Sequence, residues 1–218
     1  MKDHTGNYWR HRLEACRQQL EFNNFEAFVA ETPAAARRVF LEKILPGLRV
    51  NNAAWGDSMT LAATGILEAL RQTPGVELIE TFDPTVSREE LMERRRRALL
   101  VDLFLTGSNA VTEAGHLVNL DMVGNRVGGI TFGPRSVVIA AGRNKIAADL
   151  EAAVQRIKDY AAPANAIRHE GWKTPCRKTG RCMDCSSPQR ICNSWAVTEK
   201  SYPKGRIKVI LINENLGL

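Results

Sequence analysis

Four cysteines stand close together near the carboxyl end of the sequence, with the spacing C-x5-C-x2-C-x6-C. They are Cys176, Cys182, Cys185 and Cys192, and they account for four of the five cysteines in the chain. Thiols stay reduced in the cytosol, so such a group suits a zinc ion or an iron–sulfur cluster better than structural disulfides. Neighbouring basic residues would favour thiolates and offset the charge of a loaded site; they are Lys173, Arg177, Lys178, Arg181 and Arg190.

Three states of this cysteine group stay open. The two-residue gap between Cys182 and Cys185 is used by both zinc and iron–sulfur proteins. Zinc sites commonly have two such short pairs, and only one pair is tight here, so the uneven spacing favours a 4Fe-4S cluster over zinc. Free redox thiols are the third alternative. His169 is a candidate additional ligand, although a lone exposed histidine is the simpler interpretation.

A second group of polar residues interrupts the apolar runs of DLFLTGSNAVTEAGHLVNLDMVGNRVGGITFGPR, residues 102–135. In an open α/β sheet, ligands bind beyond the carboxyl ends of the strands, and the turn TGSN directly follows the strand-like DLFL. Small residues flank Glu113, so a substrate can approach this candidate catalytic carboxylate. Arg126 could pair with a carboxylate or phosphate, although turn formation alone also explains many of these residues. The candidate ligand-binding residues are Thr106, Gly107, Asn109, Glu113, Asn125 and Arg126.

A shorter turn earlier in the chain is the candidate opposing wall of this site. It lies between a weak strand and a helical run, where unpaired backbone N–H groups and the helix dipole favour an anion. The simpler alternative is that Asp57 or Ser58 only caps the helix. The turn matches neither a P-loop nor a dinucleotide fingerprint. Its candidate ligand-binding residues are Gly56, Asp57, Ser58 and Thr60.

These turns must be positioned by strands and helices that alternate along most of the chain. The alternation predicts an α/β fold with a largely parallel sheet flanked by helices. Strands are expected at 52–55, 76–81, 102–105, 128–131, 136–141 and 207–212. Amphipathic periodicity predicts a helix over 144–160, and Ser87 with Glu90 forms a capping-box pattern at the start of another. The run Arg94–Arg97 in that helix wraps around its axis and is expected to form a solvated face.

The first fifty residues predict helices only, with Cys16 on an apolar face as a buried core thiol. We therefore expect an N-terminal helical segment, 1–48, packed on a main α/β domain, 49–218. The main domain includes a cysteine-rich carboxyl-terminal loop at 173–193.

The totals favour a globular protein that binds a small anionic metabolite. The 218 residues suffice for one large domain, and the net charge is +6 with a pI of about 9.2. Aromatic residues make up only 6%, which argues against base stacking and makes nucleic acid an unlikely partner. No apolar run approaches the ~20 residues of a membrane span, and the charged amino end lacks a signal-peptide pattern. A cytoplasmic protein with no membrane span is expected.

The runs DLFLTGSNAVTEAGHLVNLD, GNRVGGITFGP and WGDSMT, with the ending KVILINENLGL, resemble the lactate-utilisation (LUD) domain family over most of the chain. The most specific parts are T-G-x-N-A-x-T-E-x-G and G-N-R. The resemblance implies a fold similar to the ribose-5-phosphate isomerase, glucosamine-phosphate isomerase and CoA-transferase group (NagB/RpiA/CoA-transferase-like). It also implies that the turns at 56–60 and 106–113 line the ligand cleft.

For function, the resemblance implies oxidation of lactate or related organic acids beside iron–sulfur or flavin redox partner proteins. The ligand would be an organic-acid, nucleotide-like or CoA-like anion, and the cysteine site would have an electron-transfer role. Some CoA transferases of the group use a cleft glutamate as nucleophile, and Glu113 is the nearest candidate here. Two alternatives therefore stand beside the redox role: a CoA-transferase- or isomerase-like enzyme using Glu113, and a non-enzymatic binding module with structural zinc.

Overall fold

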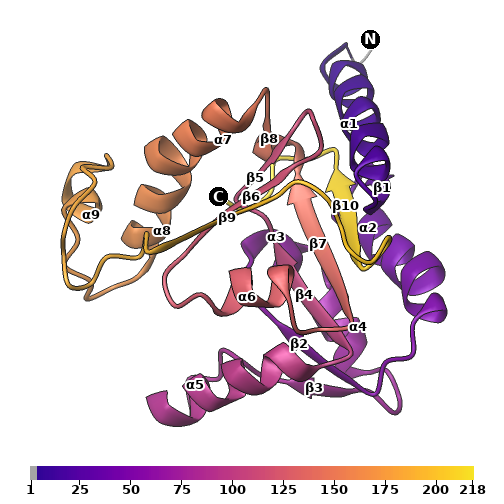
Figure 1. Ribbon diagram of the computed structural model, residues 1–218, viewed down its shortest axis with the longest axis horizontal. Helices are drawn as coiled ribbons and strands as arrows, with labels where there is room; N and C mark the ends of the chain where they lie inside the picture. Colours follow the sequence, from indigo (N-terminus) through magenta and orange to yellow (C-terminus); the bar gives the residue numbers. More distant parts are fainter. Residues whose placement is uncertain (1–3) are drawn as a thin grey trace.

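The computed structural model describes residues 4–218, which form two β-sheets and the helices around them (Figure 1). The strands of the large sheet are β1 (Glu26–Ala30), β2 (Asn52–Trp55), β3 (Glu77–Ile79), β4 (Leu103–Gly107), β7 (Ser136–Gly142) and β10 (Ile207–Ile212). The strands of the small sheet are β5 (Ala110–Thr112), β6 (Leu117–Asp121), β8 (Ile146–Ala147) and β9 (Ser194–Thr198).

The helices that flank these sheets are mostly short. They are α1 (His4–Phe22), α2 (Pro33–Val39), α3 (Met59–Thr64), α4 (Ile66–Arg71), α5 (Arg88–Arg97), α6 (Asn125–Thr131), α7 (Leu150–Arg156), α8 (Ala162–Arg168) and α9 (Pro175–Thr179). Single π-helical turns follow α2 at Phe40–Ile44 and α7 at Ile157–Ala161. Among the described residues, no helix is both long enough and apolar enough to span a membrane.

The large sheet is parallel throughout, in the order β1-β10-β7-β4-β2-β3. The small sheet has the order β8-β5-β6-β9 and mixes one parallel pair with two antiparallel pairs. Because the connections between parallel strands must cross over the sheet, they supply its covering helices. The predicted α/β fold with a largely parallel sheet flanked by helices is confirmed.

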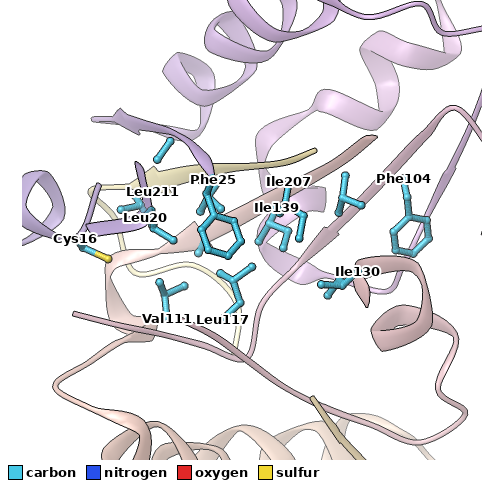
Figure 2. Packing of buried hydrophobic residues seen from close by; sticks show 14 of the residues in the cluster. Cys16, Leu20, Phe25, Phe104, Val111, Leu117, Ile130, Ile139, Ile207 and Leu211 are labelled. Atoms are coloured by element: carbon cyan, nitrogen blue, oxygen red, sulfur yellow. The ribbon is translucent and has the colours of Figure 1, made fainter. Parts of the chain in front are cut away.

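Alternate residues of the central strands enter two different cores, because successive side chains of a strand point to opposite faces. In β7, Val137 and Ile139 pack in the first core, whereas Val138 and Ala140 pack in the second. The first core lies between the large sheet, α1 and the small sheet, and Figure 2 shows its members. Cys16 belongs to it as expected, and burial raises the pKa of its thiol to about 12.

The expectation that the amino-terminal segment is wholly helical is wrong. Residues Glu26–Ala30 form β1, the edge strand of the large sheet, which pairs with β10 from Glu26 opposite Lys208 to Ala30 opposite Ile212. The chain reverses after α1 at Asn24, whose φ is 64°. The buried residues of β1 are Ala27 and Ala30, a spacing of three that imitates a helix. Residues 4–48 and 49–218 therefore share one sheet.

Two further predictions of secondary structure are corrected. Residues 128–131, predicted as a strand, lie in α6, whose first turn is bound by a carboxylate: Asp121 Oδ2 accepts from the backbone N of Arg126 at 3.0 Å and of Val127 at 3.2 Å. The helix predicted over 144–160 begins only at Leu150, where Asp149 caps the chain, because the preceding residues pair with β5 as β8. The capping residue Ser87 is confirmed, with its Oγ accepting from Glu90 N at 3.2 Å.

The turn between β5 and β6 holds α1 at a position where only glycine fits. Gly115 has a φ of 78°, and a Cβ there would lie 2.7 Å from the backbone of Gln19 and Leu20. Gly75 has a φ of 80° but open space around it. Gly75→Ala should therefore lower the free energy of unfolding by about 1 kcal/mol through backbone strain alone. Gly115→Ala should lower it by about 3 kcal/mol, because overpacking adds to the strain.

Urea unfolding of the two variants beside the parent protein measures this difference. The parent and variant m-values should agree, so that midpoints compare directly. Equal losses for Gly115→Ala and Gly75→Ala would contradict the close packing of α1 against the β5–β6 turn.

Candidate functional site

A cavity of about 230 Å³ lies beyond the carboxyl ends of the large sheet. Four neighbouring strands deliver residues to it: Asp57 and Ser58 follow β2, Phe82 follows β3, Gly107 ends β4, and Lys145 follows β7. The remaining walls come from α5, from the end of β6 with the start of α6, and from α8. This is the edge at which parallel α/β sheets bind ligands.

Six of the ten predicted ligand-binding residues line this cavity: Asp57, Ser58, Gly107, Asn109, Asn125 and Arg126. Three others lie behind the wall. Gly56 N donates to Leu105 O at 2.8 Å, Thr60 Oγ1 donates to Leu216 O at 2.9 Å, and Thr106 is fully buried. The two predicted turns therefore lie at the same cavity. Their role in ligand binding stays a prediction.

Glu113 is the predicted site residue that lies elsewhere. It does not line the cavity, and Arg12 of α1 binds its carboxylate, with Nε donating to Oε1 at 2.8 Å. The Glu113 backbone N donates to Ala147 O at 2.8 Å. This exposed ion pair fastens α1 to the small sheet. The catalytic role of Glu113 stays a prediction that the geometry of the cavity does not support.

The two turns meet so closely that Gly107 is required between them. A Cβ at Gly107 would lie 2.4 Å from Ser58 Oγ and 3.3 Å from Ala140 O. Ser58 is already fixed, because its Oγ caps α3 by accepting from Leu61 N at 3.1 Å. Helix capping by Ser58, the simpler alternative for this turn, is therefore present. The capping residue also lies at the cavity wall.

Arg126 is a partly buried positive charge whose guanidinium is bound only by neutral acceptors. Its Nη1 donates to Asn119 Oδ1 at 2.8 Å, and its Nη2 donates to Asn109 Oδ1 at 2.7 Å and to Leu120 O at 2.8 Å. Within the part of the chain that the structure describes, it forms no ion pair. Burial lowers the pKa of this guanidinium, and the charges of Asp121 and Asp57 act in the opposite direction. A buried charge without a counterion favours an anionic ligand.

Lys145 is a buried basic residue at the same cavity, and nothing in the sequence singled it out. The residue is 5% exposed, and Nζ has no hydrogen bond or ion pair with any residue of 4–218. Burial lowers the pKa of its ammonium group to about 7, and the charges of Arg156 and Arg126 add to this effect. The amine is therefore about half deprotonated at neutral pH.

Arg95 and Arg168 complete the cationic lining. Arg95, on α5, lies with its guanidinium carbon 4.8 Å from the centre of the Phe82 ring, and its buried Nε lacks a hydrogen bond. Arg168, on α8, is ion-paired with Asp57. The prediction that the run Arg94–Arg97 forms a solvated face is therefore wrong for Arg95. It is confirmed for Arg96, which is exposed.

The charges of the lining do not balance. Four basic side chains face two carboxylate side chains, those of Asp57 and Asp121, and the latter is bound by backbone N–H groups of α6. Buried polar atoms without a partner also collect here. Among the described residues they are Arg95 Nε, Thr106 Oγ1 and Asn119 Nδ2, and all three belong to the cavity wall or to a residue adjoining it. Because such atoms are rare in native proteins, their concentration marks a site.

The four predicted metal-binding cysteines line a second, smaller cavity of about 20 Å³. Cys176 lies in α9, and the others lie in the irregular chain that follows. Arg190 holds this loop, with Nη1 donating to Cys185 O at 2.6 Å and Nε donating to Cys192 O at 2.8 Å. Burial raises the pKa of the Cys192 thiol to about 11, and the neighbouring thiols add to this, against the opposing charge of Arg190. At Cys192, burial therefore opposes the thiolate form that the neighbouring basic residues are expected to favour.

The donor set of this cavity fits a metal group, although the spacing does not fit a single ion. A tetrahedral zinc ion about 2.3 Å from each sulfur sets the sulfurs about 3.8 Å apart. No three Cys, His, Asp or Glu side chains of residues 4–218 are grouped closely enough to hold one ion. The thiols nevertheless converge on one cavity, whose volume matches about one water molecule. Any metal group held there requires the loop to adjust around it.

The two cavities adjoin. Ile191 lines both, and the start of α8 lies between them, with Pro163 facing the cysteines and Asn165 facing the cation-lined cavity. In Figure 1, α7, α8 and α9 lie together on the side of the molecule away from α1. The carboxyl-terminal third of the chain therefore supplies a wall of the main cavity and the whole cysteine cavity.

Comparison with known proteins gives the family. The model of the LUD domain matches residues 13–212. The chain belongs to the LUD domain family. Membership supports a function related to lactate utilisation, and a search of the curated proteins finds no match.

Among solved structures, the chain is similar to a DUF162 family protein from Deinococcus radiodurans, with 13% identity and a TM-score of 0.50. The match covers 94% of this chain and 98% of that one. At this identity the likeness shows the fold alone. Weaker matches are eIF2B delta and eIF2B beta from Chaetomium thermophilum, at 13% and 20% identity and a TM-score of 0.28 each. They cover 64% and 62% of this chain, and 48% and 43% of theirs, and they carry no argument.

The buried Lys145 should make the stability of the LUD protein depend on pH. Its pKa is lowered from 10.5 when unfolded to about 7 when folded, so the unfolded chain holds the extra proton between these values. Above pH 10.5 this residue therefore does not reduce the free energy of unfolding. As the pH falls from 10.5 toward 7, the free energy of unfolding decreases by up to about 1.4 kcal/mol per pH unit.

Relative to the parent, Lys145→Met should gain stability as the pH is lowered from 9 to 7, and the gain should level off near 6. Thermal unfolding in buffers of constant ionic strength measures it, with the exposed Lys204→Met as control. A melting-temperature difference between Lys145→Met and parent that stays constant across this range would contradict the buried, neutral amine.

Proposed function

We propose that the protein binds a small organic-acid anion in the cation-lined cavity, as part of organic-acid oxidation. The observation that carries the proposal is the partly buried guanidinium of Arg126, which lines the cavity without an ion pair among the described residues and lies near the buried Lys145. Removing charges from water costs several kcal/mol per ion, and an anionic ligand offsets that cost. Arg95 adds an unpaired N–H donor at the rim.

The size of the cavity favours a small acid over a larger ligand. Its volume of about 230 Å³ is below the range of about 300–1,000 Å³ that drug-sized ligands occupy. A complete coenzyme A or dinucleotide would extend outside. The placement of Glu113 away from the cavity also leaves the CoA-transferase alternative without its predicted glutamate nucleophile there.

We further propose that Cys176, Cys182, Cys185 and Cys192 hold a 4Fe-4S cluster with an electron-transfer role. Four thiols around one cavity are a complete ligand set for such a cluster, and the single tight pair Cys182 and Cys185, with uneven spacing elsewhere, favours a cluster over zinc. When bound, the cluster supplies one-electron transfer. Its position beside the main cavity would suit exchange with iron–sulfur or flavin redox partner proteins on the outer side of α9.

Binding of pyruvate tests the anion site. Isothermal titration calorimetry should detect pyruvate and lactate, and Arg95→Gln should weaken both by about tenfold or more, because a hydrogen bond to a charged group is worth about 1.5–3 kcal/mol. The matched control is Arg96→Gln on the same helix, whose side chain is 69% exposed and should bind as the parent does. Absence of heat with either acid, or equal losses in both variants, would refute the site.

Anaerobic purification tests the cluster. The protein should carry iron and inorganic sulfide and should show a broad absorbance band at about 400 nm. Cys182→Ser should lose both, whereas Cys16→Ser should keep them, because Cys16 is buried in the first core. A colourless protein with one equivalent of zinc would show instead that the loop is a structural zinc site.

A further inference from the structure

Resting on the proposed organic-acid site, we propose that Lys145 is a nucleophile that forms an imine with the carbonyl carbon of a 2-oxo acid. The inference names both a catalytic residue and a substrate class. It goes beyond the binding of an anion, which any 2-hydroxy acid would share.

The position of Lys145 suits this chemistry. Lys145 lines the cavity, and its Nζ has no hydrogen bond or ion pair to any residue that the structure describes, so its lone pair or proton is not engaged. A structural buried lysine normally has a carboxylate partner, as Lys208 has with Glu26, where Nζ and Oε2 are 3.3 Å apart. Lys145 has no such partner, and this difference separates a reactive amine from a structural one.

Burial, with the surrounding positive charges, lowers the pKa of the amine, and the same charges would orient the acid. Arg126 of α6 and Arg156 of α7 are the charges that act most on Nζ, and both oppose its protonation. The other charged or titratable side chains of the cavity are Asp57, Arg95, Asp121, Arg168 and His169. A 2-oxo acid carries its carboxylate next to its carbonyl carbon, so guanidinium groups that hold the carboxylate present the carbonyl to the neighbouring amine.

The reaction balances without a further reactant. The Nζ lone pair forms a C–N bond with the carbonyl carbon while the C=O π electrons move to oxygen. A proton passes from nitrogen to that oxygen, which gives a carbinolamine. The hydroxyl takes up a proton from solvent and leaves as water while the nitrogen lone pair closes the C=N bond, and the protonated imine then returns one proton to solvent. Nothing is oxidised or reduced.

Reductive trapping tests the inference. The protein is incubated with pyruvate and sodium borohydride, digested and examined by mass spectrometry, with lactate as the matched ligand because it lacks the carbonyl. One reduced pyruvate adduct is expected on the peptide that contains Lys145. None is expected with lactate or in Lys145→Met, and Lys204→Met should label like the parent.

The pH dependence adds a readout that surface lysines would not give. Trapping should reach half its maximal rate near pH 7, since the pKa of Lys145 is about 7. An ordinary lysine, with a pKa of about 10.4, would still be gaining rate above pH 9.

The outcomes separate this inference from the proposed function. An adduct confined to Lys145 supports both. Calorimetric binding of pyruvate with no adduct, or with adducts spread over other lysines, overturns the imine and leaves the anion site standing. Binding of neither acid together with no adduct overturns both.

Discussion

The guanidinium of Arg126 is the interaction on which the rest of the site depends. Its donors reach Asn109 after β4, Asn119 in β6 and the carbonyl of Leu120, so one partly buried side chain joins the large sheet to the small one. The acceptors are neutral, so they satisfy its hydrogen bonds but not its charge. The fold therefore retains a positive charge at the place where the two sheets meet, and the cavity forms around it.

Several parts of the chain that are distant in sequence make this arrangement possible. The parallel order of β7, β4, β2 and β3 brings four carboxyl ends to one edge. Gly107 lets the turn after β4 approach Ser58, and Asp121 binds the first turn of α6, which carries Arg126. Each contact joins residues whose local roles are ordinary: a cap, a turn and a helix start. Together they exclude any large side chain from the space beside the partly buried charge.

The sequence was sufficient for much of the fold, and six of the ten ligand-binding residues that it predicted line one cavity, although their role in binding stays a prediction. The apolar run Ile207–Ile212 and the glycine-rich turn after DLFL have local signatures, and both lie where expected. β1 was missed because Ala27 and Ala30 have helical spacing, and α6 because the carboxylate that starts it belongs to β6. Lys145 and Arg95 could not be predicted as site residues. The residues next to them in the sequence do not distinguish a basic side chain that turns inward from one that faces water. The role of Lys145 and Arg95 depends on tertiary burial alone.

The arginine and lysine side chains of the cavity differ in how their charge responds to burial. A guanidinium stays charged even when burial lowers its pKa, so Arg126 keeps the site attractive to an acid at any physiological pH. An ammonium group in the same surroundings tends to lose its proton instead, because burial and, after it, the charges of Arg156 and Arg126 penalise its charge. The guanidinium that is proposed to bind the acid thus also adds to the lowering of the pKa of the amine beside it. Replacing Arg126 by a neutral residue would remove the positive charge but leave the larger effects of burial and Arg156 on Lys145, whereas exchanging Lys145 would remove only the amine.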